Sequence, residues 1–287
     1  MTPNNQTRGR HALKTPPHHT TWTELRDMWM AADELDAFES VWHWDHFYPL
    51  APPLDGPNLE AWTTLAALAQ ATERIRLGAM VNGMHHRHPA VTANMAATLD
   101  HISGGRFELG MGAGWNEIES SALGIELGSM RERFDRFDEG MEVIQSLLTR
   151  DKTTFAGRFF QLQDAFCEPK PLQDRIPIVI GGKGPKRTLR AVARFADAWD
   201  MPLPENPAEW TDLDAVLRAH CDAIGRDESE ITRMIHYQFE AEGDMAAQVA
   251  GTAPFFDAGV DVVVWRWSTP LEPDRLERLA SAISESG

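Results

Sequence analysis

IPIVIGGKGPKRTLRAVARFA, residues 176–196, is the stretch that decides the fold. Its first five residues are apolar at every position, which is typical of a strand buried on both faces of a parallel sheet. A glycine-rich turn at 181–184 follows, and a helical pattern begins at Pro185. A strand that passes through a tight turn into a helix is the repeating part of a βαβ unit, so this stretch predicts an α/β fold.

The same unit recurs along the chain. Each strand-like run is followed by a helical pattern, and the eight strands are expected at 10–15, 39–44, 75–81, 106–112, 176–182, 197–202, 231–239 and 260–267. Eight units favour closure as a (β/α)8 TIM barrel, and an open doubly wound sheet is the alternative. We therefore expect one barrel domain over 1–287.

One connection is longer than the others. The helix expected after the fourth strand spans 116–123, and the stretch 125–175 then separates it from the fifth strand. Connections in βα units usually have about 2–6 residues, so this stretch is too long to be a simple loop. We interpret 125–175 as an insertion between strands 4 and 5 that packs near the barrel mouth.

Composition and charge exclude several classes of function. The formal net charge is −16, which disfavours nucleic acid and anionic membranes as partners. No apolar run approaches the roughly 18 residues of a membrane span, and the N-terminus lacks the apolar core of a secretory signal. Cys167 and Cys221 have neither metal-ligand nor disulfide-framework spacing. We expect a cytoplasmic protein whose partner is a small molecule.

Polar residues stand where the second strand ends. In such a barrel the carboxyl ends of the strands and the loops behind them build the site. Asp45 and His46 directly follow the strand at 39–44, so ligand contact is favoured over loop capping. His46 can give or take a proton near neutral pH. The alternative is an imidazole packed between Trp44 and Phe47.

The turn at 181–184 predicts an anion site. Gly181, Gly182 and Gly184 allow successive backbone N–H groups to converge just before a helix begins. Helix N-termini with free N–H groups bind phosphate, and Lys183 could add charge. A glycine-rich turn without a ligand is the alternative.

A second glycine pattern follows the fourth strand. ELGMGAG, residues 108–114, places glycines at alternate positions, including Gly112 and Gly114. One face of the strand then lacks side chains and suits a flat ring, although close packing of the backbone is the alternative. Trp44 and Trp115 stand at mouth positions, where an aromatic side chain can line a substrate pocket.

The stretch MHHRHP, residues 84–89, invites a metal interpretation because it contains three histidines. Adjacent histidines rarely converge on one ion, and no pair of carboxylates lies nearby at helical spacing. We therefore predict no metal site. A solvated loop, or polar contacts to a ligand tail, agrees better with the pattern.

The residues also match a known family. The chain resembles the bacterial luciferase-like flavin and deazaflavin oxidoreductases. The matching stretches are TPPHHTTWTEL, ESVWHWDHF, WTTLAALAQATERIRLGAMV, RHPAVTANMAATLDHISGGRFELGMGAGWNEIE, RFDRFDEGMEVI and IPIVIGGKGPKRTLRAVARFADAWD. The resemblance implies a (β/α)8 barrel that binds FMN or the deazaflavin coenzyme F420 at its C-terminal face, and it implies a homodimer.

The resemblance also assigns roles to residues. Asp45 and His46 match a pair in deazaflavin-dependent members, in which the Asp contacts the coenzyme ring and the His lies at the reacting face. Met80–Val81 falls where the family carries a non-prolyl cis peptide that supports the ring. The cofactor-binding residues that we expect are Asp45, Met80, Val81, Gly112, Gly114, Asn116, Gly181, Gly182, Lys183 and Gly184.

The function implied is hydride transfer between F420 and a small organic substrate, with His46 and Asp45 as catalytic residues. A monooxygenase that uses reduced FMN and dioxygen is the alternative. FMN has no oligoglutamate tail, whereas 85–88 could contact the tail of F420. A barrel that has lost catalysis is a third possibility, and the Asp-His pair argues against it.

One branch of the family oxidises sugar phosphates, and this chain departs from it. Leu50 and Trp115 stand where that branch carries a Trp and a Glu that contact substrate. We therefore do not predict sugar-phosphate oxidation.

Overall fold

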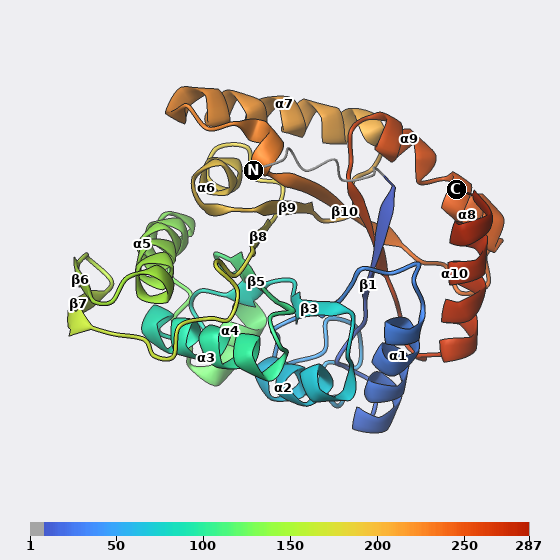
Figure 1. Ribbon diagram of the computed structural model, residues 1–287, viewed down its shortest axis with the longest axis horizontal. Coiled ribbons are helices and arrows are strands. Elements are labelled where there is room, and N and C mark those ends of the chain that lie inside the picture. Colours follow the sequence, from blue (N-terminus) through green and yellow to red (C-terminus); the bar gives the residue numbers. More distant parts are fainter. Residues whose placement is uncertain (1–8, 287) are drawn as a thin grey trace.

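A computed structural model describes residues 9–286, and eight of its parallel strands close into a barrel (Figure 1). The strand order is β3-β2-β1-β11-β10-β9-β8-β5, and β5 pairs with β3, so the sheet closes on itself. The (β/α)8 barrel expected from the sequence is therefore confirmed. The barrel strands are β1 (Arg10–Lys14), β2 (Ser40–His43), β3 (Arg76–Ala79), β5 (Phe107–Gly112), β8 (Ile178–Gly181), β9 (Ala198–Met201), β10 (Thr232–Gln238) and β11 (Val262–Arg266).

Helices surround the barrel on its outside (Figure 1). They are α1 (Trp22–Glu34), α2 (Ala61–Ala71), α3 (Pro89–Ile102), α4 (Glu117–Leu123), α5 (Met130–Thr149), α6 (Thr188–Phe195), α7 (Pro207–Ile224), α8 (Met245–Ala250), α9 (Ala253–Asp257) and α10 (Pro273–Ser286), with the 3-10 turn η1 (Glu228–Glu230). Local sequence fixes several starts. Thr21 and Ser129 form capping boxes with glutamates at the third helical position. Within residues 9–286, no helix has both the length and the apolar character that a membrane span requires.

Two separate sets of apolar side chains stabilise the barrel. The larger one lies between the strands and the helices, and includes Trp29 and Phe107. The smaller one fills the barrel interior, and its members are Ala12, Trp42, Met80, Val179, Ala198, Met234, Val262 and Val264. Because these side chains fill the interior, a ligand would bind at an end of the barrel and not inside it.

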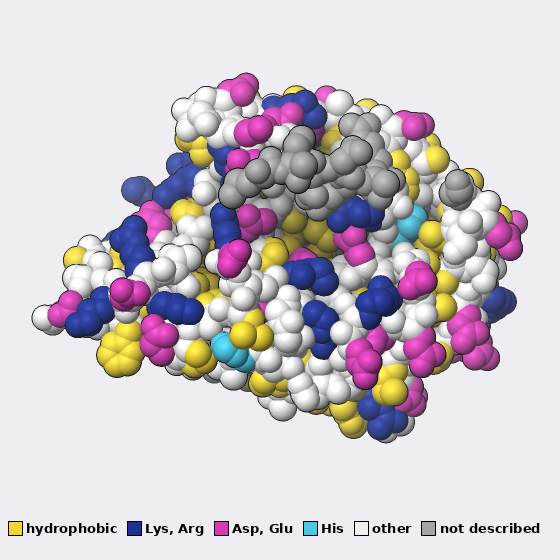
Figure 2. Space-filling view, in the orientation of Figure 1, with side chains coloured by type: hydrophobic (Ala, Val, Ile, Leu, Met, Phe, Trp, Pro, Cys, Tyr) yellow, Lys and Arg dark blue, Asp and Glu magenta, His cyan; other side chains and the backbone are white. Residues whose placement is uncertain are grey.

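The segment 125–175 contains a long helix and a hairpin. Helix α5 packs against α3, and carboxylates along α5 pair with three arginines at the start of and along α6. It therefore occupies a place in the ring of helices, and it is not solely an addition to the barrel. The antiparallel hairpin of β6 (Thr153–Ala156) and β7 (Gln161–Ala165) lies outside α5, at the left of Figure 1. In the space-filling view, acidic and basic side chains alternate over this face (Figure 2).

Candidate active site

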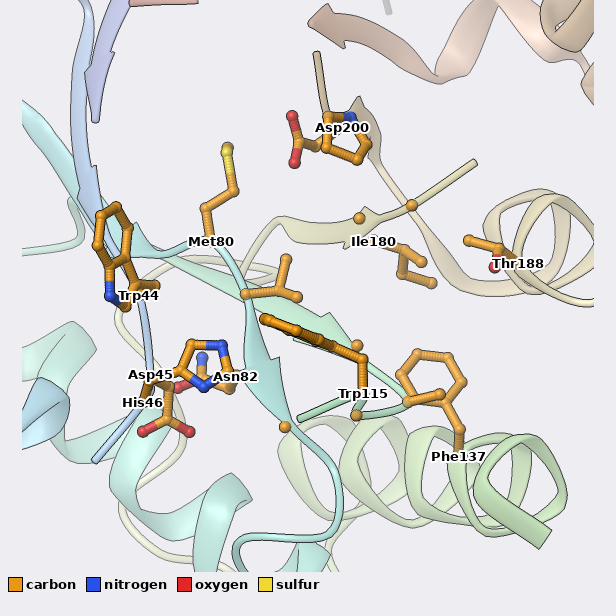
Figure 3. A pocket seen from close by; sticks show the side chains of 18 of the residues that line it. Trp44, Asp45, His46, Met80, Asn82, Trp115, Phe137, Ile180, Thr188 and Asp200 are labelled. Carbon is orange, nitrogen blue, oxygen red and sulfur yellow. The ribbon is translucent and has the colours of Figure 1, made fainter. Parts of the chain in front are cut away.

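A cavity of about 500 Å³ opens at the carboxyl ends of the barrel strands (Figure 3). This volume lies in the range of small-molecule sites. Most of the residues expected from the sequence line it. They are Trp44, Asp45, His46, Met80, Val81, Gly112, Gly114, Trp115, Gly181, Gly182 and Gly184. Asn116 and Lys183 do not line the cavity.

His46 forms a buried pair with Glu119. Glu119 was not among the site residues expected from the sequence. The Nδ1 atom of His46 lies 2.6 Å from Oε2 of Glu119, and the glutamate side chain is only 1% exposed. An ionised carboxylate only accepts hydrogen bonds, so Nδ1 carries the proton. The atom left for a ligand is therefore Nε2, which makes no hydrogen bond within residues 9–286. The edge of the His46 ring packs against Trp115, with 5.4 Å between the ring centroids.

Three donors converge on Glu119. Besides His46, the backbone N–H of Phe47 donates to Oε1 at 2.5 Å, and Nδ2 of Asn116 donates to Oε2 at 3.1 Å. Burial acts to raise the pKa of Glu119, but the hydrogen bonds from His46 and Phe47 outweigh burial and hold the pKa below its usual value. Glu119 is therefore a carboxylate that holds His46 in one tautomer.

Asn116 has a different place from the one expected. It is the N-cap of α4, its Oδ1 accepts the backbone N–H of Glu119, and its Nδ2 orients the same residue's carboxylate. The neighbouring Glu117 points outward, with a side chain 78% exposed and paired with Arg133. An Asn followed three residues later by a Glu is typical of a helix N-cap. The sequence pattern therefore predicts a capping role for Glu119 and gives no sign of its contact with His46.

Asp45 is buried at 2% exposure, and the side chains of Arg87 and His86 bind its carboxylate. Arg87 donates to both carboxylate oxygens, at 2.6 and 3.0 Å, and Nδ1 of His86 lies 3.1 Å from Oδ2. Burial acts to raise the pKa of Asp45, but hydrogen bonds from His86 and Arg87 hold it well below its usual range. His86 and Arg87 thus bind Asp45. They are not a free basic groove for a coenzyme tail.

The segment after β3 bends into the cavity. The peptide bond between Met80 and Val81 is cis, as expected from the family resemblance. A Cβ atom on Gly112 would lie 2.6 Å from Cγ2 of Val81, and one on Gly110 would overlap the carbonyl oxygen of Ala79. The alternate glycines of β5 therefore provide room for this bend, which agrees with close backbone packing.

The glycine-rich loop after β8 presents backbone to the cavity. Gly182 has a φ of +132°, which favours glycine, and a Cβ on Gly184 would lie 2.7 Å from Oγ1 of Thr188. No side chain caps the N-terminus of α6, which leaves N–H groups there for an anion, except that of Leu189, which donates to the carbonyl of Gly184 at 3.0 Å. Lys183 does not contribute, because its Nζ binds Oε1 of Glu209 at 2.8 Å and the carbonyl of Leu203 at 2.9 Å.

The sequence matches a known family over nearly its whole length. The model of the Luciferase-like monooxygenase family matches residues 3–281. The chain belongs to this family. The resemblance seen in the sequence is therefore confirmed.

Curated relatives of this luciferase-like protein include several enzymes. It is similar to the F420-dependent glucose-6-phosphate dehydrogenase of Kineococcus radiotolerans, with 31% identity over 262 residues, which cover 91% of this chain and 76% of the relative. It is also similar to the pyrimidine monooxygenase of Allorhizobium ampelinum, with 39% identity over 142 residues, which cover 49% of this chain and 38% of the relative.

Solved structures support the same fold. An F420-dependent secondary alcohol dehydrogenase in complex with an F420-acetone adduct superposes with a TM-score of 0.84. The alignment covers 96% of this chain and 99% of that chain, at 19% sequence identity. At this identity the likeness concerns the fold alone.

A second group of polar residues lines the cavity of this luciferase-like protein and was missed by the sequence analysis. Lys14, Asp200, His236 and Arg266 come from the ends of β1, β9, β10 and β11. In Figure 3, Asp200 and Met80 lie on one side of the view, and Asp45 and His46 lie on the other. The sequence signal for them was position: Lys14 and Arg266 are the last residues of their strands, and Asp200 and His236 lie within two residues of the ends of theirs.

Proposed function

We propose that the protein transfers a hydride between the deazaflavin coenzyme F420 and a small organic substrate. The observation that carries the proposal is the His46–Glu119 pair, which leaves an imidazole Nε2 on the wall of the cavity beside the Met80–Val81 bend. The relative from Kineococcus radiotolerans, which matches 91% of this chain, carries F420 dependence in its name.

The residues present fit the coenzyme. Gly112 and Gly114 let the side chains of Val81 and His85 pack directly against the end of β5, and Val81 then presents an apolar surface to the cavity on which a flat ring could lie. The loop around Gly182 would hold the phosphate through backbone N–H groups, as helix N-termini do. Asp45 keeps its charge close to the cavity but exchanges no proton, because Arg87 and His86 occupy it.

Proton movement is assigned to His46. When bound, the deazaflavin supplies a two-electron hydride acceptor or donor. Nε2 of His46 takes the proton from a substrate hydroxyl during oxidation, or gives it to a carbonyl oxygen during reduction. The buried Glu119 carboxylate stabilises the imidazolium that forms, so its effect falls on the step in which the proton moves.

The experiment that tests the proposal is a coenzyme titration of the apoprotein. We expect F420 to bind with quenching of its fluorescence, and we expect FMN to bind more weakly. The control is Glu117→Gln, which changes an exposed residue near the site. Tight FMN binding without an F420 response would instead support a monooxygenase that uses reduced FMN and dioxygen, a candidate favoured by the similarity to the pyrimidine monooxygenase.

A screen of alcohols, ketones and enones with the bound coenzyme tests for catalysis. We expect a substrate-dependent absorbance change in the wild type and its loss in His46→Ala. If no compound changes the coenzyme spectrum in the wild type, the protein is a barrel without catalysis.

The protein is also proposed to be a homodimer. Helix α4 exposes two large apolar side chains, Ile118 (67%) and Leu123 (43%). Trp115 (62%) and Met130 (61%), which stand at the edge of the cavity, are exposed as well. Exposed apolar patches of this kind are typical of interaction sites. Sedimentation of the wild type and of Ile118→Glu measures the mass, and an equal monomer mass for both contradicts the proposal.

A further inference from the structure

Two cations lie side by side at the end of the barrel that holds the cavity. Lys14 on β1 and Arg266 on β11 are direct register partners in neighbouring parallel strands. Both line the cavity. Like charges on adjacent strands repel each other, and a low dielectric strengthens the repulsion. This arrangement is therefore favourable only when a negative group lies close to both.

Within residues 9–286, neither cation has a carboxylate oxygen within 4.0 Å. The closest hydrogen-bonding atom to Lys14 Nζ is Nε2 of His236, at 3.4 Å. Arg266 donates to a neutral amide, Oε1 of Gln238, at 2.9 Å. Lys14 is only 7% exposed, and burial lowers its pKa to about 8. Asp200 acts on Lys14 through its charge, but Nε2 of His236 is the one hydrogen-bonding partner of the three ammonium N–H groups within the described residues.

Asp200 gives a second, independent sign of a missing group. It is 3% exposed, and its Oδ1 makes no hydrogen bond within the described residues, although Nε2 of His236 lies 3.1 Å away in a poor direction. Buried polar atoms without a partner are uncommon and indicate a ligand or water. Burial lowers the pKa of His236, so that ring is neutral at pH 7. Lys14, Arg266 and Asp200 then carry a summed charge of +1.

We infer that Lys14 and Arg266 form a subsite for the carboxylate of the substrate, which makes the substrate a small monocarboxylic acid with an apolar body. This inference rests on the proposed function and deepens it. A charge of +1 matches a monoanion, and Asp200 disfavours a dianion such as a phosphate monoester. Apolar walls stand beside the cations: Lys14 Nζ lies 5.6 Å from the ring centroid of Trp44, and Met80 borders His236.

The test uses three probes of similar shape. Benzoate is a monoanion, benzamide is its neutral counterpart, and phenyl phosphate is close to a dianion above neutral pH. Calorimetry on the full chain, with and without F420, measures the binding of each probe. The variant is Lys14→Met, and the matched control is Lys152→Met, an exposed lysine outside the cavity.

We expect the wild type and Lys152→Met to bind benzoate about tenfold more tightly than benzamide, the size of one charge-assisted contact. Lys14→Met should abolish that preference, and Asp200→Asn should increase the affinity for phenyl phosphate. If Lys14→Met does not fold, Arg266→Gln reports on the same preference from the other cation.

Equal binding of benzoate and benzamide by the wild type would overturn the inference. A carboxylate preference that persists in the folded Lys14→Met and Arg266→Gln proteins would overturn it as well. The coenzyme titration is read separately. If F420 does not bind while the preference for benzoate depends on Lys14, the subsite stands and the proposed coenzyme falls.

Discussion

Replacing Glu119 with Gln tests whether the buried carboxylate assists proton movement at His46. Three donors meet the two oxygens of Glu119: His46 Nδ1, Phe47 N–H and Asn116 Nδ2. Glutamine has one accepting oxygen and one donating amide, so it cannot satisfy all three. Either the Phe47 N–H or the His46 ring then faces a donor, and the negative charge is absent in both arrangements.

The size of the effect follows from the geometry. The pair between His46 and Glu119 is short, at 2.6 Å, and almost fully buried. Hydrogen bonds to charged groups contribute about 1.5–3 kcal/mol, and removing one partner of a buried ion pair costs about 3–5 kcal/mol. If Glu119 stabilises the protonated imidazole of His46 by about 2–4 kcal/mol, losing its charge slows the proton-coupled step roughly 30- to 1000-fold.

Single-turnover absorbance of the bound coenzyme measures that step directly. The control is Glu117→Gln, which removes a carboxylate from the same helix but from an exposed position. A second readout is the nitrogen NMR spectrum of His46. The wild type should show the Nδ1-protonated tautomer, and Glu119→Gln should shift the population toward the Nε2-protonated form.

A rate for Glu119→Gln within about threefold of the Glu117→Gln rate would refute the reasoning, provided that coenzyme affinity is unchanged. So would an unaltered tautomer of His46. In either case Glu119 would be only a structural anchor for Phe47.

Three further predictions concern the other parts of the site. Lys14→Met should be more stable than the wild type at pH 7. Burial lowers the pKa of Lys14 from 10.5 to about 8, so between these pH values the unfolded wild type binds a proton that the folded protein has lost. The free energy of unfolding of the wild type, measured with urea, should therefore rise by about 3 kcal/mol as the pH rises through this range. Asp45→Asn should lose about 3 kcal/mol at pH 7, since Arg87 loses its buried partner, and this deficit should shrink below about pH 4 as the unfolded wild-type aspartate becomes protonated and its advantage is lost. Gly112→Ala should weaken F420 binding about tenfold by displacing Val81, and adding Val81→Ala should restore much of it, as read by fluorescence titration; an equal loss in the double variant would contradict the steric explanation.

The fold was predictable because its signals are local. The apolar run at 176–180, the glycine turn after it and the helix that follows lie within one stretch, and a strand-like run followed by a helical pattern is found eight times along the chain. The position of α5 was not predictable in this way. The helix at 117–123 satisfies the local pattern, but ion pairs such as Arg187–Asp135 place α5 in the ring, and these pairs join segments about fifty residues apart.

The site shows the same limit. Asp45 and His46 were found because position alone places them at a strand end. Lys183 was expected to bind an anion because a cation lies in a glycine turn, yet Glu209 on α7 draws it away. Glu119 was missed because its partner, His46, lies 73 residues earlier in the chain. The local sequence predicts which residues stand at the cavity end of the barrel. Ion-pair partners far away in the chain decide which of their charges remain free to bind a ligand.

The free charges then constrain how a substrate must lie. His46 follows β2, whereas the unpaired cations end β1 and β11, the next two strands of the sheet. A substrate anchored by its carboxylate at Lys14 and Arg266 therefore reaches Nε2 of His46 only when its hydroxyl or carbonyl stands at a fixed distance from that carboxylate. A homologous series of keto acids of increasing length should accordingly show one optimal length, and equal rates at every length would contradict anchoring by these two cations.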